Sequence, residues 1–105
     1  MDINIYYTKE EILNTKPHFN YVDNGTDLYL HQIDGEFVIY KKLYILKKDA
    51  TELTEIYVEL KVYMIIVAHL RNSKTRWVNL LDAYVFYNIK DYFECLEEAN
   101  KNKLF

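Results

Sequence analysis

Four side chains are of types suited to nucleophilic or metal chemistry, and none has the spacing of a recognisable site. His18, His31 and His69 are spread along the sequence, and no second cysteine or nearby histidine accompanies Cys95. Metal sites need clustered ligands at recurring intervals, so we predict no metal centre and no cofactor. Cys95 lies in the acidic stretch FECLEE. Because neighbouring carboxylates raise the pKa of a thiol, we interpret Cys95 as a helix residue at the margin of the core.

The sequence also lacks the other common catalytic patterns. Its 2 glycines are too few for a GxGxxG loop or a P-loop. Ser73 lies in a charged loop without a flanking motif, and the pairs Glu10-Glu11 and Glu97-Glu98 are most simply solvated carboxylates. We therefore predict that the chain is not an enzyme. Enzymatic activity stays as the third hypothesis, because scattered polar residues can converge in a fold.

A grouping of cations and aromatic rings indicates a second class of function. The cations that would form a nucleic-acid surface are Lys41, Lys42, Lys47, Lys48, Arg71, Lys74 and Arg76, with Tyr40 and Tyr44 as rings for stacking. Positive charge beside stackable rings is typical of proteins that bind single-stranded nucleic acid. Lysines on strands also protect sheets against edge-to-edge aggregation, and adjacent Lys41 and Lys42 point to opposite faces of a strand. Nucleic-acid binding is therefore the alternative hypothesis.

The tyrosine content favours protein binding. The chain has 11 tyrosines in 105 residues, and tyrosine supplies rigid, amphipathic contact area that is enriched in protein interfaces. The alternative explanation of the tyrosine content is an AT-rich codon usage together with packing between neighbouring strands. The predicted interface consists of Tyr57, Glu59, Tyr63, Lys41 and Arg76. Self-association of two copies through an edge strand would be another contact of the same class.

Composition limits the architecture to one folded domain, residues 1–105. The chain is 50% hydrophobic and 28% charged, which excludes the low apolar content of disordered proteins. At 105 residues one core is expected. The net charge of −3 is too balanced for a basic face across the whole domain, so a nucleic-acid site would be a local patch.

Several features bear on the compartment and the source. We predict a soluble cytoplasmic protein without membrane contact. The chain has a single cysteine and no signal-peptide pattern, and its most apolar stretch is interrupted by charges at Glu55, Glu59 and Lys61. Lysine, asparagine, isoleucine and tyrosine are abundant, while glycine and proline number only 2 and 1. This bias predicts an AT-rich genome, such as that of many bacteria, phages, archaeal viruses or poxviruses.

The first half of the chain carries clear local signals. Residues 3–7 predict a short strand, and Thr8 with Glu11 forms a capping box that starts a helix through about Asn14, before Pro17. Two dipeptides suited to type I′ turns follow, Asn24-Gly25 and Asp34-Gly35. They predict a three-stranded antiparallel meander at residues 19–23, 26–33 and 36–47.

The apolar stretch at residues 51–70 fits two structures. A helical stripe runs through Leu53, Ile56, Tyr57, Leu60, Tyr63, Met64, Val67 and Leu70. Residues 55–64 also alternate strictly between apolar and largely polar positions, and the stretch is rich in β-branched residues. We favour a long central strand that returns antiparallel to residues 36–47, with a bend or bulge near residues 64–67.

The last third completes an α+β fold. Residues 75–87 predict one or two further strands, although Trp77, Leu80, Leu81, Tyr84 and Val85 also match a helical stripe. Residues 88–103 place Ile89, Tyr92, Phe93, Leu96 and Ala99 at helical spacing, with Asn88 or Asp91 as the N-cap. The predicted fold is an antiparallel β-sheet, made of the meander and the long central strand, with a short N-terminal helix and a C-terminal helix packed on one face.

The leading hypothesis from the sequence is a small cytoplasmic protein that binds another protein, as an inhibitor or adaptor. Short domains without catalytic motifs from AT-rich genomes fit viral or mobile-element proteins directed at host machinery, including anti-defence inhibitors, which would act in the host cytoplasm. This association rests on composition and length, and it specifies no binding mechanism.

Overall fold

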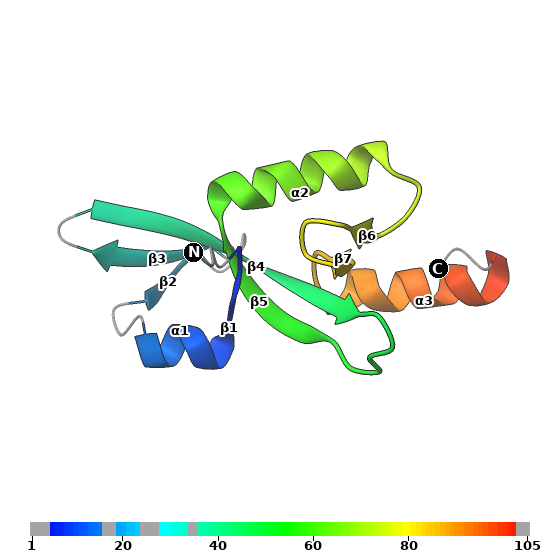
Figure 1. Ribbon diagram of the computed structural model, residues 1–105, viewed down its shortest axis with the longest axis horizontal. Coiled ribbons are helices and arrows are strands. Elements are labelled where there is room, and N and C mark those ends of the chain that lie inside the picture. Colours follow the sequence, from blue (N-terminus) through cyan, green and yellow to red (C-terminus); the bar gives the residue numbers. More distant parts are fainter. Residues whose placement is uncertain (1–4, 16–18, 24–27, 34–35, 103–105) are drawn as a thin grey trace.

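The computed structural model describes residues 5–15, 19–23, 28–33 and 36–102, and the structural statements below concern these residues. The elements in chain order are β1 (Tyr7–Thr8), α1 (Lys9–Thr15), β2 (Phe19–Asp23), β3 (Leu28–Ile33), β4 (Glu36–Lys47), β5 (Thr54–Glu59), α2 (Leu60–Asn72), β6 (Trp77–Val78), β7 (Ala83–Phe86) and α3 (Ile89–Asn102). The predicted α+β class with an antiparallel sheet is confirmed (Figure 1).

Strand β4 is the centre of the sheet and pairs along both of its edges. The strand order is β1-β5-β4-β3-β2, while β7 pairs with β4 and β6 pairs with β7. Lys41 lies opposite Leu28 of β3 and also opposite Val58 of β5. Tyr44 lies opposite residues of both β5 and β7. One edge of β4 is therefore taken by β5, and the other is shared in tandem by β3 and β7.

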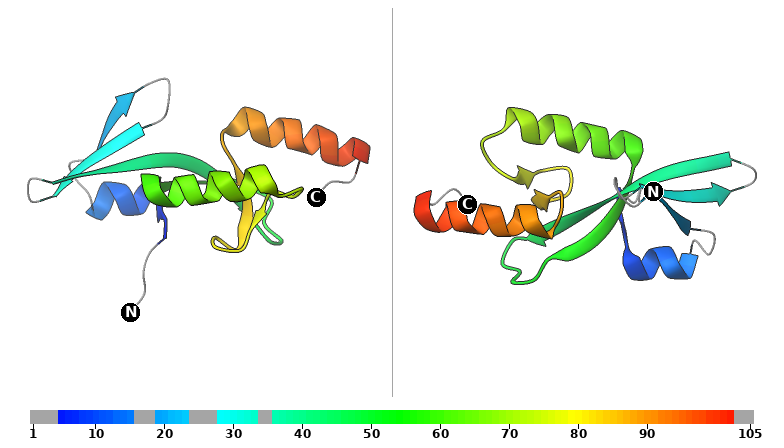
Figure 2. Two further views of the ribbon diagram at one scale, coloured as in Figure 1. Left: turned by 90° about the horizontal axis from the view of Figure 1, so that it is seen from above. Right: turned by 180° about the vertical axis from the view of Figure 1, so that it is seen from behind.

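The predicted meander is present as β2, β3 and β4. Both pairings are antiparallel, and the register places Phe19 opposite His31 and Ile33 opposite Glu36. The two dipeptides Asn24-Gly25 and Asp34-Gly35 lie outside the described residues, so the turn types stay predictions. Figure 2 shows β2 and β3 at the end of the molecule remote from α3.

The N-terminal capping box is confirmed. The Thr8 Oγ1 accepts a hydrogen bond from the Glu11 amide at 3.3 Å, and the Glu11 Oε1 accepts one from the Thr8 amide at 3.1 Å. This exchange satisfies backbone donors that have no partner inside the helix. The helix ends at Thr15, and Pro17 lies outside the described residues.

The first strand, β1, is shorter than the strand predicted at residues 3–7 and begins later in the chain. Residues 3–4 lie outside the described part, residues 5–6 are not in a strand, and β1 covers Tyr7–Thr8. Tyr7 lies opposite Tyr57 and Thr8 opposite Ile56, so β1 adds a two-residue pairing along the outer edge of β5.

The long strand predicted through residues 51–70 is wrong beyond Glu59. Strand β5 ends at Glu59, and Leu60–Asn72 forms helix α2, which also excludes the predicted bulge near residues 64–67. The helix buries Ile66 and Leu70 against the sheet. Each buried aliphatic side chain contributes roughly 1.5–3 kcal/mol, whereas a β-branched residue in a helix costs at most about 0.7 kcal/mol. The antiparallel pairing of β4 with β5 was predicted correctly.

The sheet carries helices on both faces. On one face α2 covers the main core, which contains Leu43, Ile45, Ile56, Val58, Ile66, Leu70, Val78, Leu81, Ala83 and Val85. On the opposite face, Ile12 of α1 packs with Tyr40 and Tyr57. Period-two alternation along β4 and β5 explains this division, since adjacent residues of a strand point to opposite faces. None of the helices in the described residues has the length and apolar content to cross a bilayer.

Residues 75–87 form two short strands, so the helical alternative for this stretch is wrong. Helix α3 follows, and the Asn88 Oδ1 accepts a hydrogen bond from the Asp91 amide at 2.7 Å, which identifies Asn88 as the N-cap. Tyr92 contacts the buried Phe86 of β7 edge-to-face, with ring centroids 5.1 Å apart. Two residues of the expected apolar stripe, Ile89 and Phe93, are exposed. The C-terminal part of the helix extends past the sheet (Figure 1).

The capping box generates a stability prediction. Thr8→Ala removes the hydroxyl that accepts the Glu11 amide, so we expect the free energy of unfolding in urea to fall by about 1 kcal/mol. The matched control is Thr51→Ala in the exposed loop before β5, which should change that energy by less than about 0.5 kcal/mol. Equal losses in the two variants would contradict a capping role for Thr8.

Candidate functional site

The five residues predicted as a protein interface do not form one patch. Tyr57 is only 5% exposed, because α1 covers its face of the sheet and Ile12 packs against it. The expectation that Tyr57 is available on an open polar face is therefore wrong. Arg76 lies in the connection between α2 and β6 and contacts α3. Glu59 forms an ion pair with Lys61 at 3.4 Å. Of the five residues, Lys41 and Tyr63 are in contact with each other.

Lys41 and Tyr63 meet where α2 begins. The Lys41 Nζ lies 5.2 Å from the centroid of the Tyr63 ring, within the range of a cation–π contact worth about 0.5–1 kcal/mol when exposed. The connectivity produces this contact, since Lys41 of β4 pairs with Val58 and the chain enters α2 two residues later. Burial raises the pKa of Tyr63; the Tyr87 hydroxyl adds to this rise and Arg71 opposes it.

Two exposed apolar side chains continue this surface along β4. Phe37 and Ile39 are 61% and 39% exposed. They lie on the same face as Lys41, because residues two apart on a strand share a face. Helix α2 runs toward the other end of β4 and leaves this part uncovered (Figure 1). We call Phe37, Ile39, Lys41 and Tyr63 the β4 strip.

Sequence reasoning missed Phe37 and Ile39, although a signal was present. In the segment FVIY the flanking positions Val38 and Tyr40 are also apolar, so both faces of the strand are apolar there. Val38 and Tyr40 pack in the cluster under α1. A strand that is apolar on both faces needs two covering partners, and no described element covers the second face at this position.

The opposite face carries a hydrogen-bonded carboxylate. The Glu55 Oε2 accepts from the Tyr57 hydroxyl at 2.7 Å, the Oε1 accepts from the Tyr44 hydroxyl at 3.3 Å, and the Lys42 Nζ lies 3.9 Å away. Burial is the main cause of the raised pKa of Tyr44. Both oxygens of Glu55 thus accept hydrogen bonds from tyrosines of the sheet, and Lys42 has a carboxylate neighbour that offsets its charge.

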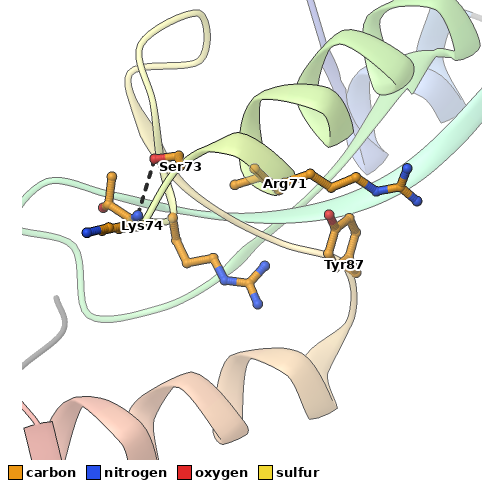
Figure 3. A pocket seen from close by; sticks show the side chains of 7 residues that line it. Arg71, Ser73, Lys74 and Tyr87 are labelled. Carbon is orange, nitrogen blue, oxygen red and sulfur yellow. Dashed lines mark hydrogen bonds between the residues drawn. The ribbon is translucent and has the colours of Figure 1, made fainter.

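A cationic hollow lies where α2 ends. It has a volume of about 270 Å³ and is lined by Leu70, Arg71, Ser73, Lys74, Thr75, Arg76 and Tyr87 (Figure 3). The Ser73 Oγ accepts from the Thr75 amide and the Thr75 Oγ1 accepts from the Trp77 amide, each at 3.2 Å. These turn hydrogen bonds fix the backbone of the loop. We call this hollow the α2-end pocket.

The pocket gathers three of the seven predicted nucleic-acid residues, Arg71, Lys74 and Arg76. The other four do not join them. Lys41 belongs to the β4 strip and Lys42 pairs with Glu55, while Lys47 and Lys48 are exposed at the far end of β4. The cations therefore do not follow one continuous track.

Arg76 connects this pocket to α3. Its Nη2 donates to the Asp91 Oδ1 at 2.7 Å, and the Asp91 Oδ2 accepts from the Tyr87 amide at 2.9 Å. The guanidinium also lies 5.6 Å from the Tyr87 ring centroid. One carboxylate thus fixes both Arg76 and the backbone before α3, so the pocket wall formed by Tyr87 is held in place.

Cys95 has the environment of an unreactive thiol. Burial is the main cause of its raised pKa, with Asp91 adding to the rise and Arg76 opposing it. This corrects the expected cause, which was the adjacent carboxylates of the helix. The Sγ lies 3.8 Å from the Asp91 Oδ1, and a raised pKa disfavours the nucleophilic thiolate at neutral pH.

The other chemically suited side chains do not converge. The His69 Nε2 lies 3.2 Å from the Trp77 carbonyl oxygen. Within residues 5–15, 19–23, 28–33 and 36–102, no group of three or more His, Cys, Asp and Glu side chains is placed to hold a metal ion. Apart from the Glu55 network, the two groupings in the described part of the chain that we consider as binding sites are the β4 strip and the α2-end pocket.

Comparison with known proteins gives no match to any family model, curated protein or solved structure. The functional interpretation therefore depends on the geometry of the β4 strip and the α2-end pocket.

The buried Tyr40 generates a pH prediction. Burial, with smaller contributions from Tyr7 and Glu59, raises the pKa of Tyr40 from 10.0 to about 12. A raised folded-state pKa means that this stabilisation is complete below pH 10 and is lost as the pH rises toward 12. We expect the free energy of unfolding to fall through this range, and to fall less steeply in Tyr40→Phe.

Urea unfolding at a series of pH values measures this dependence, with each variant referred to its own value at neutral pH. Parallel pH profiles for Tyr40→Phe and the unsubstituted chain would contradict the assignment.

Proposed function

We propose that this chain is a small protein-binding domain that acts as an inhibitor or adaptor through the β4 strip. The observation that carries the proposal is the exposure of Phe37 and Ile39 in line with Lys41 on a strand that is paired with β3. Exposed large apolar side chains on a sheet surface are a typical sign of a binding site when they are contiguous. Phe37 provides the aromatic anchor that is enriched at interface hot spots.

The chemistry of the strip defines the partner. Phe37 and Ile39 require an apolar surface, and Lys41 with the Tyr63 ring forms a polar and aromatic border to it. Lys61, with its exposed ammonium, lies two residues from Tyr63 at the start of α2. A protein with an apolar depression bordered by carboxylates fits this arrangement.

The partner is expected in a reducing cytoplasm, which would be the host cytoplasm if the chain is a viral or mobile-element protein directed at host defence. The proposal includes a second kind of protein contact, since β2 is the terminal strand of the sheet and two copies could pair through that edge. Nucleic-acid binding is less well supported because the seven predicted cations are dispersed. It would depend on the α2-end pocket alone.

The test is an affinity pull-down from lysate with and without nuclease treatment, followed by a binding titration with the recovered protein. Phe37→Ala and Lys41→Ala should each weaken binding about tenfold or more, because truncation of an interface anchor costs more than 1 kcal/mol. For Phe37→Ala, the free energy of unfolding in urea should stay within about 0.5 kcal/mol of that of the unsubstituted chain, since the ring is exposed.

Matched controls are Phe93→Ala, which removes an exposed ring from α3, and Lys48→Ala at the far end of β4. Both should retain the affinity of the unsubstituted chain. Loss of binding in the controls but not in the strip variants would contradict the proposed surface. Recovery that disappears after nuclease treatment would favour the nucleic-acid alternative.

A further inference from the structure

We infer that the α2-end pocket binds a phosphate monoester, with Arg71, Arg76 and the Tyr87 hydroxyl contacting the phosphoryl oxygens. The inference does not rest on the proposed protein interface: none of these residues belongs to the β4 strip, although Arg71 and the Tyr87 hydroxyl lie near enough to Tyr63 to influence its pKa. It depends on charge, on hydrogen-bond donors and on the size of the hollow.

The pocket has an excess of positive charge. Arg71, Lys74 and Arg76 line it, and none of its lining residues is acidic. Asp91 offsets one of these charges through Arg76. Within the described residues, Arg71 and Lys74 form no ion pair at salt-bridge distance. The end of α2 contributes a partial negative charge of about half a unit, which is smaller than the remaining two positive charges.

The neutral groups of the pocket supply donors. Ser73 Oγ and Thr75 Oγ1 each accept a backbone amide, so each hydroxyl keeps its proton for donation to another acceptor. The Tyr87 hydroxyl is a further donor in the lining. Guanidinium groups give paired, charge-assisted hydrogen bonds to phosphate oxygens, which a dianionic group with three terminal oxygens uses more fully than a carboxylate does.

The size of the hollow suits a small anionic group. The volume of about 270 Å³ is below the range of roughly 300–1,000 Å³ that encloses drug-sized ligands. Figure 3 shows the Arg71 side chain beside the Tyr87 ring, while the Lys74 side chain points away from both. Arg71 therefore lies on the Tyr87 side of the pocket, where we place the direct contact, and Lys74 lies on the other side.

The test is a titration of isotope-labelled protein, followed by NMR, with phenyl phosphate, inorganic phosphate and acetate. Phenyl phosphate should shift the amides of residues 70–76 and 87, and acetate should bind at least about tenfold more weakly. Arg71→Gln should weaken phenyl phosphate binding about tenfold, as expected for loss of a charge-assisted pair. Lys74→Gln should have a smaller effect.

The control is Lys48→Gln, which removes one exposed positive charge outside the pocket. Equal weakening by Arg71→Gln and Lys48→Gln, or shifts that lie outside the pocket, would overturn the inference. Tighter binding of phenyl phosphate than of inorganic phosphate would identify an ester, such as a phosphorylated side chain, as the source of the group. The reverse order would identify free phosphate and overturn the monoester assignment. The titration needs no protein partner, so its failure would leave the proposed interface intact.

Discussion

The double-edged pairing of β4 is the constraint on which the rest of the structure depends. Its residues 40–41 pair with both β3 and β5, and its residues 44–45 pair with both β5 and β7. The meander at one end and the core under α2 at the other therefore share one continuous strand. Leu43 and Ile45, both fully buried, anchor that strand in the main core. A change that displaces them would disturb both halves of the sheet together.

The same strand accounts for the proposed binding surface. Period-two alternation puts Phe37 and Ile39 on the face that holds Leu43 and Ile45 in the core. The covering helix α2 starts only after Glu59, opposite Tyr40, and runs toward the other end of β4 (Figure 1). The first part of β4 is held in the sheet by its pairing with β3, yet no helix among the described residues covers the face that carries Phe37 and Ile39. The exposed strip is therefore a consequence of connectivity.

Local sequence signals predicted the elements that depend on neighbouring residues. These include the Thr8 capping box, the antiparallel meander and the return of β5 along β4. They failed where distant packing decides. The strand-like alternation continues past Glu59, but these residues form α2, which buries Ile66 against the sheet. Similarly, sequence placed Tyr57 on an open face, because nothing local shows that α1 covers it. The loop cations at Arg71, Lys74 and Arg76 were noted as candidates, while their convergence with Tyr87 required the fold.

The measurement that tests the central role of β4 most directly is native-state hydrogen exchange, read by NMR on the free protein. We expect the amides of residues 40–45 that bond within the sheet to exchange slowest, through global unfolding only. We also expect faster exchange in α3, which extends past the sheet (Figure 2). Exchange of the β4 amides at the rates of α3, or separate unfolding of the meander with loss of protection at residues 40–41, would contradict the account.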